Sequence, residues 1–421
     1  MNSFTAILLV GFVCAFAGKV SARVEIDCSV FVYGQNAWLY NVSDTSECIA
    51  SVSRVRQYCG GSKINFYPTA HFYQTNSVAT GFCYWVDTEC VPVNDSMIQT
   101  MAIGMFKCFD AAVKEGFTHI EVSPHLDDGA QSGFWRNALV MNPLAVYANY
   151  SYYDVMVKPI AQALNQAAMT TTQAYMSMQG EMNLMVMTYP YEFLQMARAS
   201  KCVIAGSTLP VDNVKVGVSL NYNKLFGMDY ANTDYAATVD LQAIHNLFYG
   251  VDFLGMSSYP NTDAVPLPAQ FSNAISPLAS ELSFVGINLG DLLAAPGHEL
   301  HFSEAGVGGG ICNEGNCPAK TFAEAVQTPY FGIFGEFNPA TNPWGTPEMQ
   351  SALTTYYKQF VIWATEEMTY QYPVSAVFLW TVSSWDVCSI YHSDSNTLGT
   401  YRIDAICTML QNWNDKGIVP V

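Results

Sequence analysis

The chain has 421 residues, of which 50% are hydrophobic and only 12% are charged. This composition can supply a large buried core and excludes an intrinsically disordered chain. The net charge of −18 is not interrupted by any run of Lys or Arg, which argues against nucleic acid or an anionic membrane as a partner and favours a neutral substrate.

The first 22 residues have the pattern of a secretory signal peptide. An apolar run from Ala6 to Ala17 precedes the small residues Val20-Ser21-Ala22, which suit a cleavage site. No Lys or Arg precedes the run, so an uncleaved anchor is the alternative. A membrane span needs about 20 apolar residues, and neither this run nor any later segment is long enough. We therefore expect a secreted protein whose single domain covers residues 23–421.

Eight strand-like runs follow in the mature chain, each rich in β-branched and aromatic residues. They cover residues 24–34, 63–73, 118–126, 173–181, 214–222, 251–260, 299–306 and 375–385.

Helical patterns lie between these runs. Residues 96–116 repeat apolar side chains at three- and four-residue spacing, with Asp95 or Ser96 as the N-cap and Gly116 as the stop. Similar stretches cover residues 155–168, 191–201, 234–248 and 348–367. The alternation predicts an α/β fold, a single (β/α)8 TIM barrel with long loops. A doubly wound open sheet is the alternative, but a G-x-G-x-x-G fingerprint after the first strand is missing.

Cysteine spacing predicts disulfides that staple the loops. Eleven of the twelve cysteines follow the signal peptide, so at least one stays free or pairs with another molecule. Short spacings suggest the local pairs Cys48 to Cys59, Cys83 to Cys90 and Cys312 to Cys317, although sequence does not fix the connectivity. Asn-x-Ser sequons, typical of a glycosylated secreted protein, lie at Asn41, Asn94 and Asn149.

Two glutamates lie where predicted strands end. Glu181 ends the fourth run, and Glu304, followed by the glycine-rich segment 306–310, lies near the end of the seventh. Active sites of such barrels form at the carboxyl ends of the strands. Two carboxylates at one barrel mouth are what glycoside hydrolysis needs, one as proton donor and one as nucleophile. A solvated turn carboxylate is the ordinary alternative for either residue alone.

Several segments resemble clan A glycoside hydrolases, which are retaining enzymes on (β/α)8 barrels. The segments are "FSEAGVGG", "VDFLGMSSYP" and "AVFLWTVSSWD". "SPHLDDGAQSGFWRN", residues 123–137, is similar to the stretch after the third strand in glycoside hydrolase family 113, whose characterised members are largely β-mannanases. The likeness extends over residues 118–386.

The resemblance implies roles for four residues. Glu181 would be the acid/base and Glu304 the nucleophile. Tyr259 would donate a hydrogen bond to Glu304, and Trp380 would form the floor under the sugar before the cleaved bond. A strand-ending turn and a core tryptophan are the respective alternatives for Tyr259 and Trp380. Burial or like-charge repulsion is expected to keep Glu181 protonated in the free enzyme.

Further polar and aromatic residues near strand ends are candidates for substrate binding. His125, Asp127 and Asp128 would hydrogen-bond sugar hydroxyls, and Trp135 with Arg136 would line another subsite. His71 and Tyr222, at the ends of the second and fifth runs, complete the set: His71, Tyr222, His125, Asp127, Asp128, Trp135, Arg136, Tyr259 and Trp380. The His-x-Asp-Asp pattern is weak evidence for a metal, so we expect neither metal nor cofactor.

Two positions depart from the resemblance. Most clan A enzymes have Asn immediately before the acid/base, where it contacts the sugar 2-hydroxyl, but this chain has Gly180. Family 113 also lacks that Asn and usually has a small hydroxyl residue. Ser123 stands where the family tends to have Lys. Both departures affect how the sugar is held, and Gly180 in particular leaves the preference for mannose open.

The sequence therefore predicts a secreted retaining glycosidase that acts on a neutral β-linked polysaccharide or oligosaccharide, with β-1,4-mannan as the leading substrate. A β-glucanase or β-galactanase is the first alternative. The second is a non-catalytic protein of an extracellular wall or matrix that binds carbohydrate on a glycosidase barrel.

Overall fold

Eight parallel strands close into a barrel in the computed structural model. It describes residues 23–32, 46–86, 89–206, 208–221, 223–307, 319–326, 344–366, 371–382 and 402–421. The barrel strands are β1 (Ile26–Val32), β2 (Lys63–Thr75), β5 (His119–Val122), β7 (Gln173–Gly180), β8 (Val214–Asn221), β9 (Phe253–Ser258), β10 (Glu299–Ala305) and β11 (Ala376–Val382). β1 pairs in parallel with both β2 and β11, which closes the ring. The predicted (β/α)8 barrel is confirmed.

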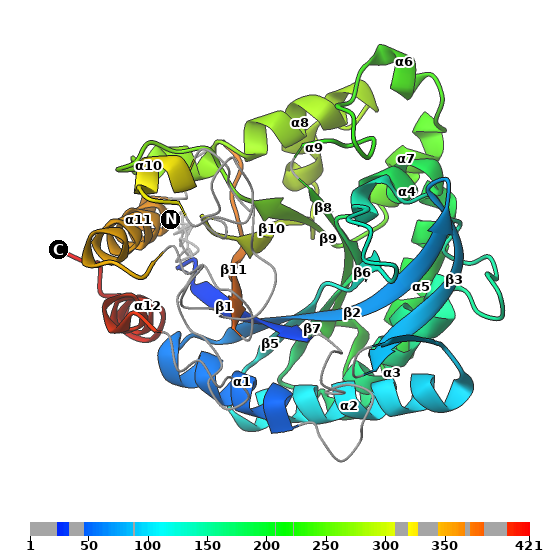
Figure 1. Cartoon of the computed structure of the whole chain (residues 1–421), viewed down its shortest axis with the longest axis horizontal. Coiled ribbons are helices and arrows are strands. Elements are labelled where there is room, and N and C mark those ends of the chain that lie inside the picture. Colours follow the sequence, from blue (N-terminus) through cyan, green and yellow to red (C-terminus); the bar gives the residue numbers. More distant parts are fainter. Residues whose placement is uncertain are drawn as a thin grey trace, which may run out of the picture.

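The helices lie around the outside of these strands (Figure 1). They are α1 (Ser46–Tyr58), α2 (Asp95–Lys114), α3 (Lys158–Ala167), α4 (Asn183–Thr188), α5 (Pro190–Ile204), α6 (Thr233–Ala236), α7 (Leu241–Phe248), α8 (Ile275–Phe284), α9 (Leu289–Ala294), α10 (Phe322–Ala325), α11 (Pro347–Glu366) and α12 (Asp404–Lys416). Figure 1 also shows β2 extending beyond the barrel, where it pairs with β3 (Val78–Val86). β4 (Glu89–Pro92) and β6 (His125–Asp128) complete this small sheet.

Local side-chain caps explain two differences from the predicted helices. The stretch 234–248 is two helices, because the Asp240 side chain accepts a hydrogen bond from the N–H of Ala243 and so begins α7. The N-cap of α2 is Asn94, one residue before the predicted caps, and its side chain accepts from Met97. Gly116 follows α2 at φ +89°, a conformation that favours glycine, as its predicted role as the stop requires.

The disulfides differ in part from the predicted local staples. Cys83 and Cys90 are bonded across the β3–β4 hairpin, as expected. The pair Cys48 to Cys59 is wrong: Cys48 joins α1 to α2 through Cys108, and Cys59 bonds Cys28 in β1. Spacing favoured the nearer partner, whereas packing of α1 against β1 and α2 determines which sulfurs meet. Cys202 is exposed and has no disulfide partner in the described part of the chain.

Some predicted features fall outside the described residues, namely the signal peptide, Asn41, Cys312, Cys317 and Tyr222. Asn94 and Asn149 are exposed, as glycosylation requires. Within the described ranges, none of the helices is both long and apolar enough to cross a membrane.

A buried ionic cluster lies inside the barrel towards the amino-terminal ends of the strands. The His301 imidazolium lies 2.7 Å from Glu121 through Nδ1 and 3.0 Å from Glu299 through Nε2. Burial alone would lower the pKa of His301, but the charge of Glu121 raises it to about 9. Burial would raise the pKa of Glu121, but the charge of His301 and hydrogen bonds from His119 and His301 lower it to about 2. The pair is therefore ionised at neutral pH.

Glu121→Gln should destabilise the fold by about 3 kcal/mol at pH 6, because it leaves the buried His301 charge with one partner. The stabilising effect of the His301 charge is complete below its unfolded pKa of about 6.5 and is lost as pH rises through about 9. Urea unfolding at pH 6 and pH 9.5 measures both effects. Glu299→Gln is the matched control and should cost less, since the side chain of Glu299 is 28% exposed. Equal costs for the two variants would contradict this account.

Candidate active site

Glu181 lies in a tight turn directly after β7. Its φ of 56° is in the left-handed region, which is uncommon for a residue with a side chain and is found most often where function constrains the backbone. Its N–H donates to the carbonyl of Ser219 in β8 at 3.0 Å. Its carboxylate accepts from Arg136 Nη2 at 2.9 Å and from Asn221 Nδ2 at 3.1 Å. The buried carboxylate is thus held from two sides.

Glu304 is aimed by an irregularity in β10. The register between β10 and β9 shifts between Phe302 and Glu304. The carbonyl of Ser303 instead accepts hydrogen bonds from Asn65 Nδ2, at 2.9 Å, and from the Tyr67 hydroxyl inside the barrel. Such bulges redirect the side chain that follows them. The result is a buried carboxylate at the carboxyl end of β10.

The two oxygens of Glu304 have different surroundings. Oε1 accepts a hydrogen bond from the Tyr259 hydroxyl at 2.6 Å, as the resemblance implied. Oε2 is buried and has no hydrogen-bond partner among the described residues. Nε2 of His125 lies 3.7 Å from Oε2, too far for a hydrogen bond. Tyr259 therefore fixes one oxygen, and the other has no hydrogen-bond partner among the described residues.

The surroundings of Glu304 favour its protonated form. Burial, and then the negative charge of Glu181, raise the pKa of Glu304 to about 8, against the lowering effects of Tyr259 and Arg136. Protonation of Glu181 in the free protein stays a prediction. The Arg136 guanidinium lies 2.9 Å from its carboxylate, a contact that the sequence did not suggest.

Arg136 joins the two carboxylates nearest to it. Nη1 lies 2.8 Å from Asp127, and Nε donates to the carbonyl of Gly180 at 3.1 Å. Although burial disfavours the charged guanidinium, Glu181 and Asp127 raise the pKa of Arg136 further. Arg136 was predicted to line a subsite, and that role stays a prediction; its observed contacts are with Asp127, Glu181 and the carbonyl of Gly180.

Aromatic rings form one wall of the site. Trp380, in β11, is nearly parallel to the His125 ring at an interplanar angle of 13°, with ring centroids 5.7 Å apart. Tyr67 packs against both rings, at 4.8 Å from Trp380 and 5.1 Å from His125. Burial, and then the charges of Glu304 and Glu121, raise the pKa of Tyr67 well above its usual value, so its hydroxyl stays protonated.

Three other predicted residues have no described contact with Glu181 or Glu304. Asp128 accepts from the N–H groups of Ala130 and Ser132, so its oxygens are engaged within its own turn. His71 is buried, with its ring 5.5 Å from that of Trp85. Trp135 is half-buried and immediately precedes Arg136. These three are near the site in sequence and topology, and their predicted contacts with substrate stay predictions.

Sequence reasoning missed two residues of the site. Asn221 contacts Glu181, whereas its neighbour Tyr222, at the end of the same predicted strand, was the predicted substrate-binding residue. Tyr67 lies in the middle of a predicted strand, and nothing in the sequence distinguishes it from an ordinary core residue. Alternation of side chains along the strand would have placed Tyr67 and Asn65 on one face, but only the closed barrel reveals that both reach Ser303.

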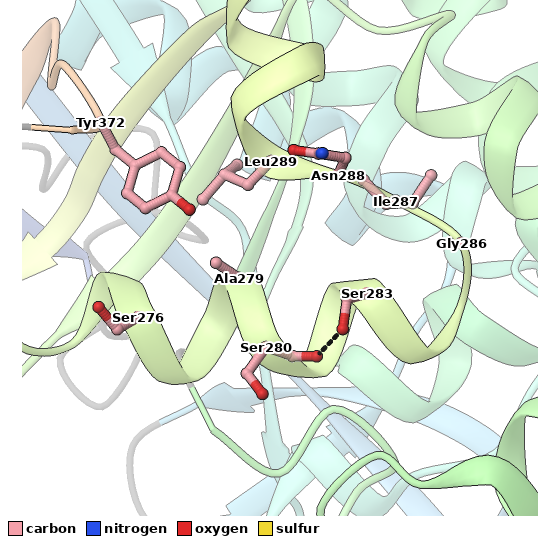
Figure 2. Close-up of a pocket in the computed structure, with 9 residues that line it drawn as sticks. All are labelled: Ser276, Ala279, Ser280, Ser283, Gly286, Ile287, Asn288, Leu289 and Tyr372. Atoms are coloured by element: carbon pink, nitrogen blue, oxygen red, sulfur yellow. Dashed lines mark hydrogen bonds between the residues drawn. The ribbon is translucent and has the colours of Figure 1, made fainter.

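A pocket of about 500 Å³ lies elsewhere on the molecule (Figure 2). It is lined by the α8 serines Ser276, Ser280 and Ser283, by Asn288 and by Tyr372, without any charged residue. Its walls come from α8, from residues 286–289 at the start of α9, and from Tyr372. Nothing connects this pocket with the predicted residues. In the described ranges, no group of three or more His, Cys, Asp or Glu is placed to hold a metal ion.

Comparison with solved structures finds the same fold in two β-1,4-mannanases of glycoside hydrolase family 113. One superimposes with a TM-score of 0.51 at 11% sequence identity, over 93% of this chain and 99% of the other. The other, a complex structure, gives 0.53 at 10% identity over the same shares. No protein-family model matches the sequence, and no curated protein matches it either. At these identities the similarity shows the barrel fold, and it involves the family that the motifs resemble.

Glu304→Gln should make the protein more stable than wild type above pH 8, by about 2–5 kcal/mol. Because the pKa of Glu304 is raised in the folded state, its stabilising contribution is complete below pH 4.5 and is lost as pH rises through about 8. Glutamine does not ionise and avoids that loss. Urea unfolding between pH 4 and 9 measures the difference, with the exposed Glu348→Gln as control. Parallel stability curves for wild type and Glu304→Gln would refute the prediction.

Proposed function

We propose that this protein is a secreted retaining glycoside hydrolase that cleaves a neutral β-linked polysaccharide, with β-1,4-mannan as the leading substrate. The observation that carries the proposal is the buried pair of carboxylates at the carboxyl ends of β7 and β10. Glu304 has one oxygen bonded to Tyr259 and the other unpartnered within the described residues. A nucleophilic carboxylate needs this combination of fixed orientation and a free attacking oxygen.

In the first step, Glu304 Oε2 attacks the anomeric carbon while the departing glycosidic oxygen takes the proton of Glu181. The product is a glycosyl ester on Glu304. In the second step, the Glu181 carboxylate removes a proton from water, whose oxygen attacks the anomeric carbon and releases Glu304 as a carboxylate. Trp380 offers an aromatic face on which the apolar face of a sugar ring packs. No metal or cofactor takes part.

The proton must be on Glu181 when the bond breaks, whereas burial raises the pKa of Glu304 to about 8, so that Glu304 holds a proton at neutral pH in the free protein. We infer that substrate binding redistributes this proton. Arg136 then keeps its ion pair with Asp127, at 2.8 Å, while Glu181 becomes neutral. This step gives Asp127 a role as the partner that holds the guanidinium charge near the site.

Mannan as substrate rests on two supports. The segment 123–137 resembles family 113, and two solved structures with the same fold are described as β-1,4-mannanases. The neutral substrate agrees with the strongly acidic chain. Secretion is supported by the predicted signal peptide and by three disulfides, which form in oxidising compartments.

A carbohydrate-binding protein without turnover is the second candidate. One observation favours it, namely the ion pair between Arg136 and Glu181, which opposes protonation of the acid/base. The two candidates differ in one measurable property, because only the enzyme releases reducing ends from its polymer.

Reducing-sugar release from mannan, β-glucan and β-galactan tests the proposal directly. We expect release from mannan, and we expect Glu181→Gln and Glu304→Gln to lower it by at least about a hundredfold, since general acid catalysis and nucleophilic attack are each lost. Glu348→Gln, at an exposed residue outside the site contacts described above, should leave the rate unchanged. Absence of release from every polymer, with binding retained by both variants, would establish the second candidate instead.

The pH dependence gives a second test. Glu304 holds a proton below pH about 8, and the proposed mechanism passes this proton to Glu181, so kcat/KM of the wild type should fall as pH rises through this value. With an aryl glycoside whose leaving group needs no proton, Glu181→Gln should lose this basic limb, because the variant lacks the acid that receives the proton. A basic limb near pH 8 that persists in Glu181→Gln would contradict the assigned roles.

A further inference from the structure

The glycine before Glu181 is explained by the ring of His125. A β-carbon built at position 180 would lie 2.6 Å from Cδ2 and 2.8 Å from Nε2 of His125, and 3.3 Å from the carbonyl of Pro124. Contacts this short do not occur, so any side chain at position 180 would displace the imidazole. The His125 ring therefore occupies the space into which an Asn side chain at position 180 would begin.

The same ring nitrogen faces the atom proposed to attack the sugar. Nε2 of His125 is 3.7 Å from Oε2 of Glu304. The 2-hydroxyl of a sugar is attached to the carbon next to the one that Oε2 attacks, so a group that binds this hydroxyl must lie beside Oε2. The two atoms are too far apart for a direct hydrogen bond with each other. A sugar hydroxyl that lies beside them can hydrogen-bond to either atom.

The chemistry of His125 suits this contact. Burial, and then the charge of Arg136, lower the pKa of His125 well below its usual value, so the imidazole is neutral and can donate through one nitrogen and accept through the other. Its position is fixed, because the ring packs between Tyr67 and Trp380. A neutral imidazole on this wall can offer an N–H donor to a hydroxyl, as an Asn amide does.

We propose that His125 binds the 2-hydroxyl of the sugar at the cleaved bond, replacing the Asn that precedes the acid/base in most clan A enzymes, and that Gly180 is the residue that makes room for it. The inference rests on the proposed function, and it identifies a specificity-determining residue. Hydrogen bonds to this hydroxyl strengthen in the transition state of retaining enzymes, so His125 contributes to rate as well as to the choice of sugar.

The first test removes the hydroxyl and the imidazole separately and together. The substrates are the shortest aryl β-oligosaccharide that the wild type cleaves and its analogue lacking the 2-hydroxyl at the cleaved bond. In the wild type, we expect kcat/KM for the analogue to be at least about a hundredfold below that for the parent substrate, after correction for intrinsic reactivity. In His125→Phe, we expect this ratio between the two substrates to be about tenfold smaller. The intrinsic reactivity cancels when the two ratios are compared. Phenylalanine keeps the ring packing and removes both nitrogens.

Another buried barrel histidine provides the control. His119 stacks on Tyr175, away from the two glutamates, and His119→Phe should discriminate between the two substrates as the wild type does. If His125→Phe discriminates equally well, His125 only packs in the wall and the inference is wrong. If the wild type cleaves neither the polymers nor the aryl substrate, the proposed function fails first, and the inference with it.

The second test exchanges the two positions. Gly180→Asn alone should lower kcat/KM at least about a hundredfold, because its side chain collides with His125. In the double variant His125→Ala with Gly180→Asn, the amide has room, and kcat/KM should exceed that of His125→Ala by at least about tenfold. If the two substitutions change log kcat/KM independently, so that their effects add in the double variant, the proposed exchange is wrong. This outcome would count against the exchange even if the protein is an active glycosidase. Thermal unfolding of each variant separates loss of contact from loss of fold.

Discussion

The inward-turned carbonyl of Ser303 is the contact on which the site depends. It withdraws from the β10 ladder to accept hydrogen bonds from Asn65 and Tyr67, and this sets the bulge that aims Glu304. The hydroxyl of the same residue donates to Glu121 at 3.0 Å, so Ser303 also joins the buried ionic cluster. Ser303 thus connects the buried ionic cluster, towards the amino-terminal ends of the strands, with the site at their carboxyl ends. The carboxylate proposed to attack is held by main-chain geometry and by its own hydrogen bond together.

The barrel contains two groups of buried charged residues, and the groups differ in how many of their carboxylate oxygens have hydrogen-bond partners. At the lower end, both oxygens of Glu121 are hydrogen-bonded and its partner His301 is fully charged. At the mouth, Glu181 and Asp127 share a single guanidinium, and Oε2 of Glu304 has no partner within the described residues. Buried polar groups without partners are costly, and natural proteins retain them where they react. The contrast distinguishes the paired charges around Glu121 from the cluster that is proposed to react.

The eight strands were predictable because parallel strands buried on both faces form continuous apolar runs, which are easy to detect in sequence. Glu181 and Glu304 were predictable for a related reason, since a carboxylate that ends such a run is unusual. Contacts between segments that are distant in the sequence left no local signal. The bond between Asn221 and Glu181, the ion pair of Arg136 and the disulfide between Cys48 and Cys108 join segments 40 to 60 residues apart, and only the packed chain brings them together.

The interlock of Gly180 with His125 also has an evolutionary consequence. A side chain at position 180 and an imidazole at position 125 exclude one another, so the unfavourable intermediates are a chain that has both and a chain that has neither. A change from one arrangement to the other by single substitutions passes through one of these two states. Relatives of this chain should show the two positions changing together. Searches that weight an Asn before the catalytic glutamate will pass over such lineages, and a covariation of these two columns offers a way to find them.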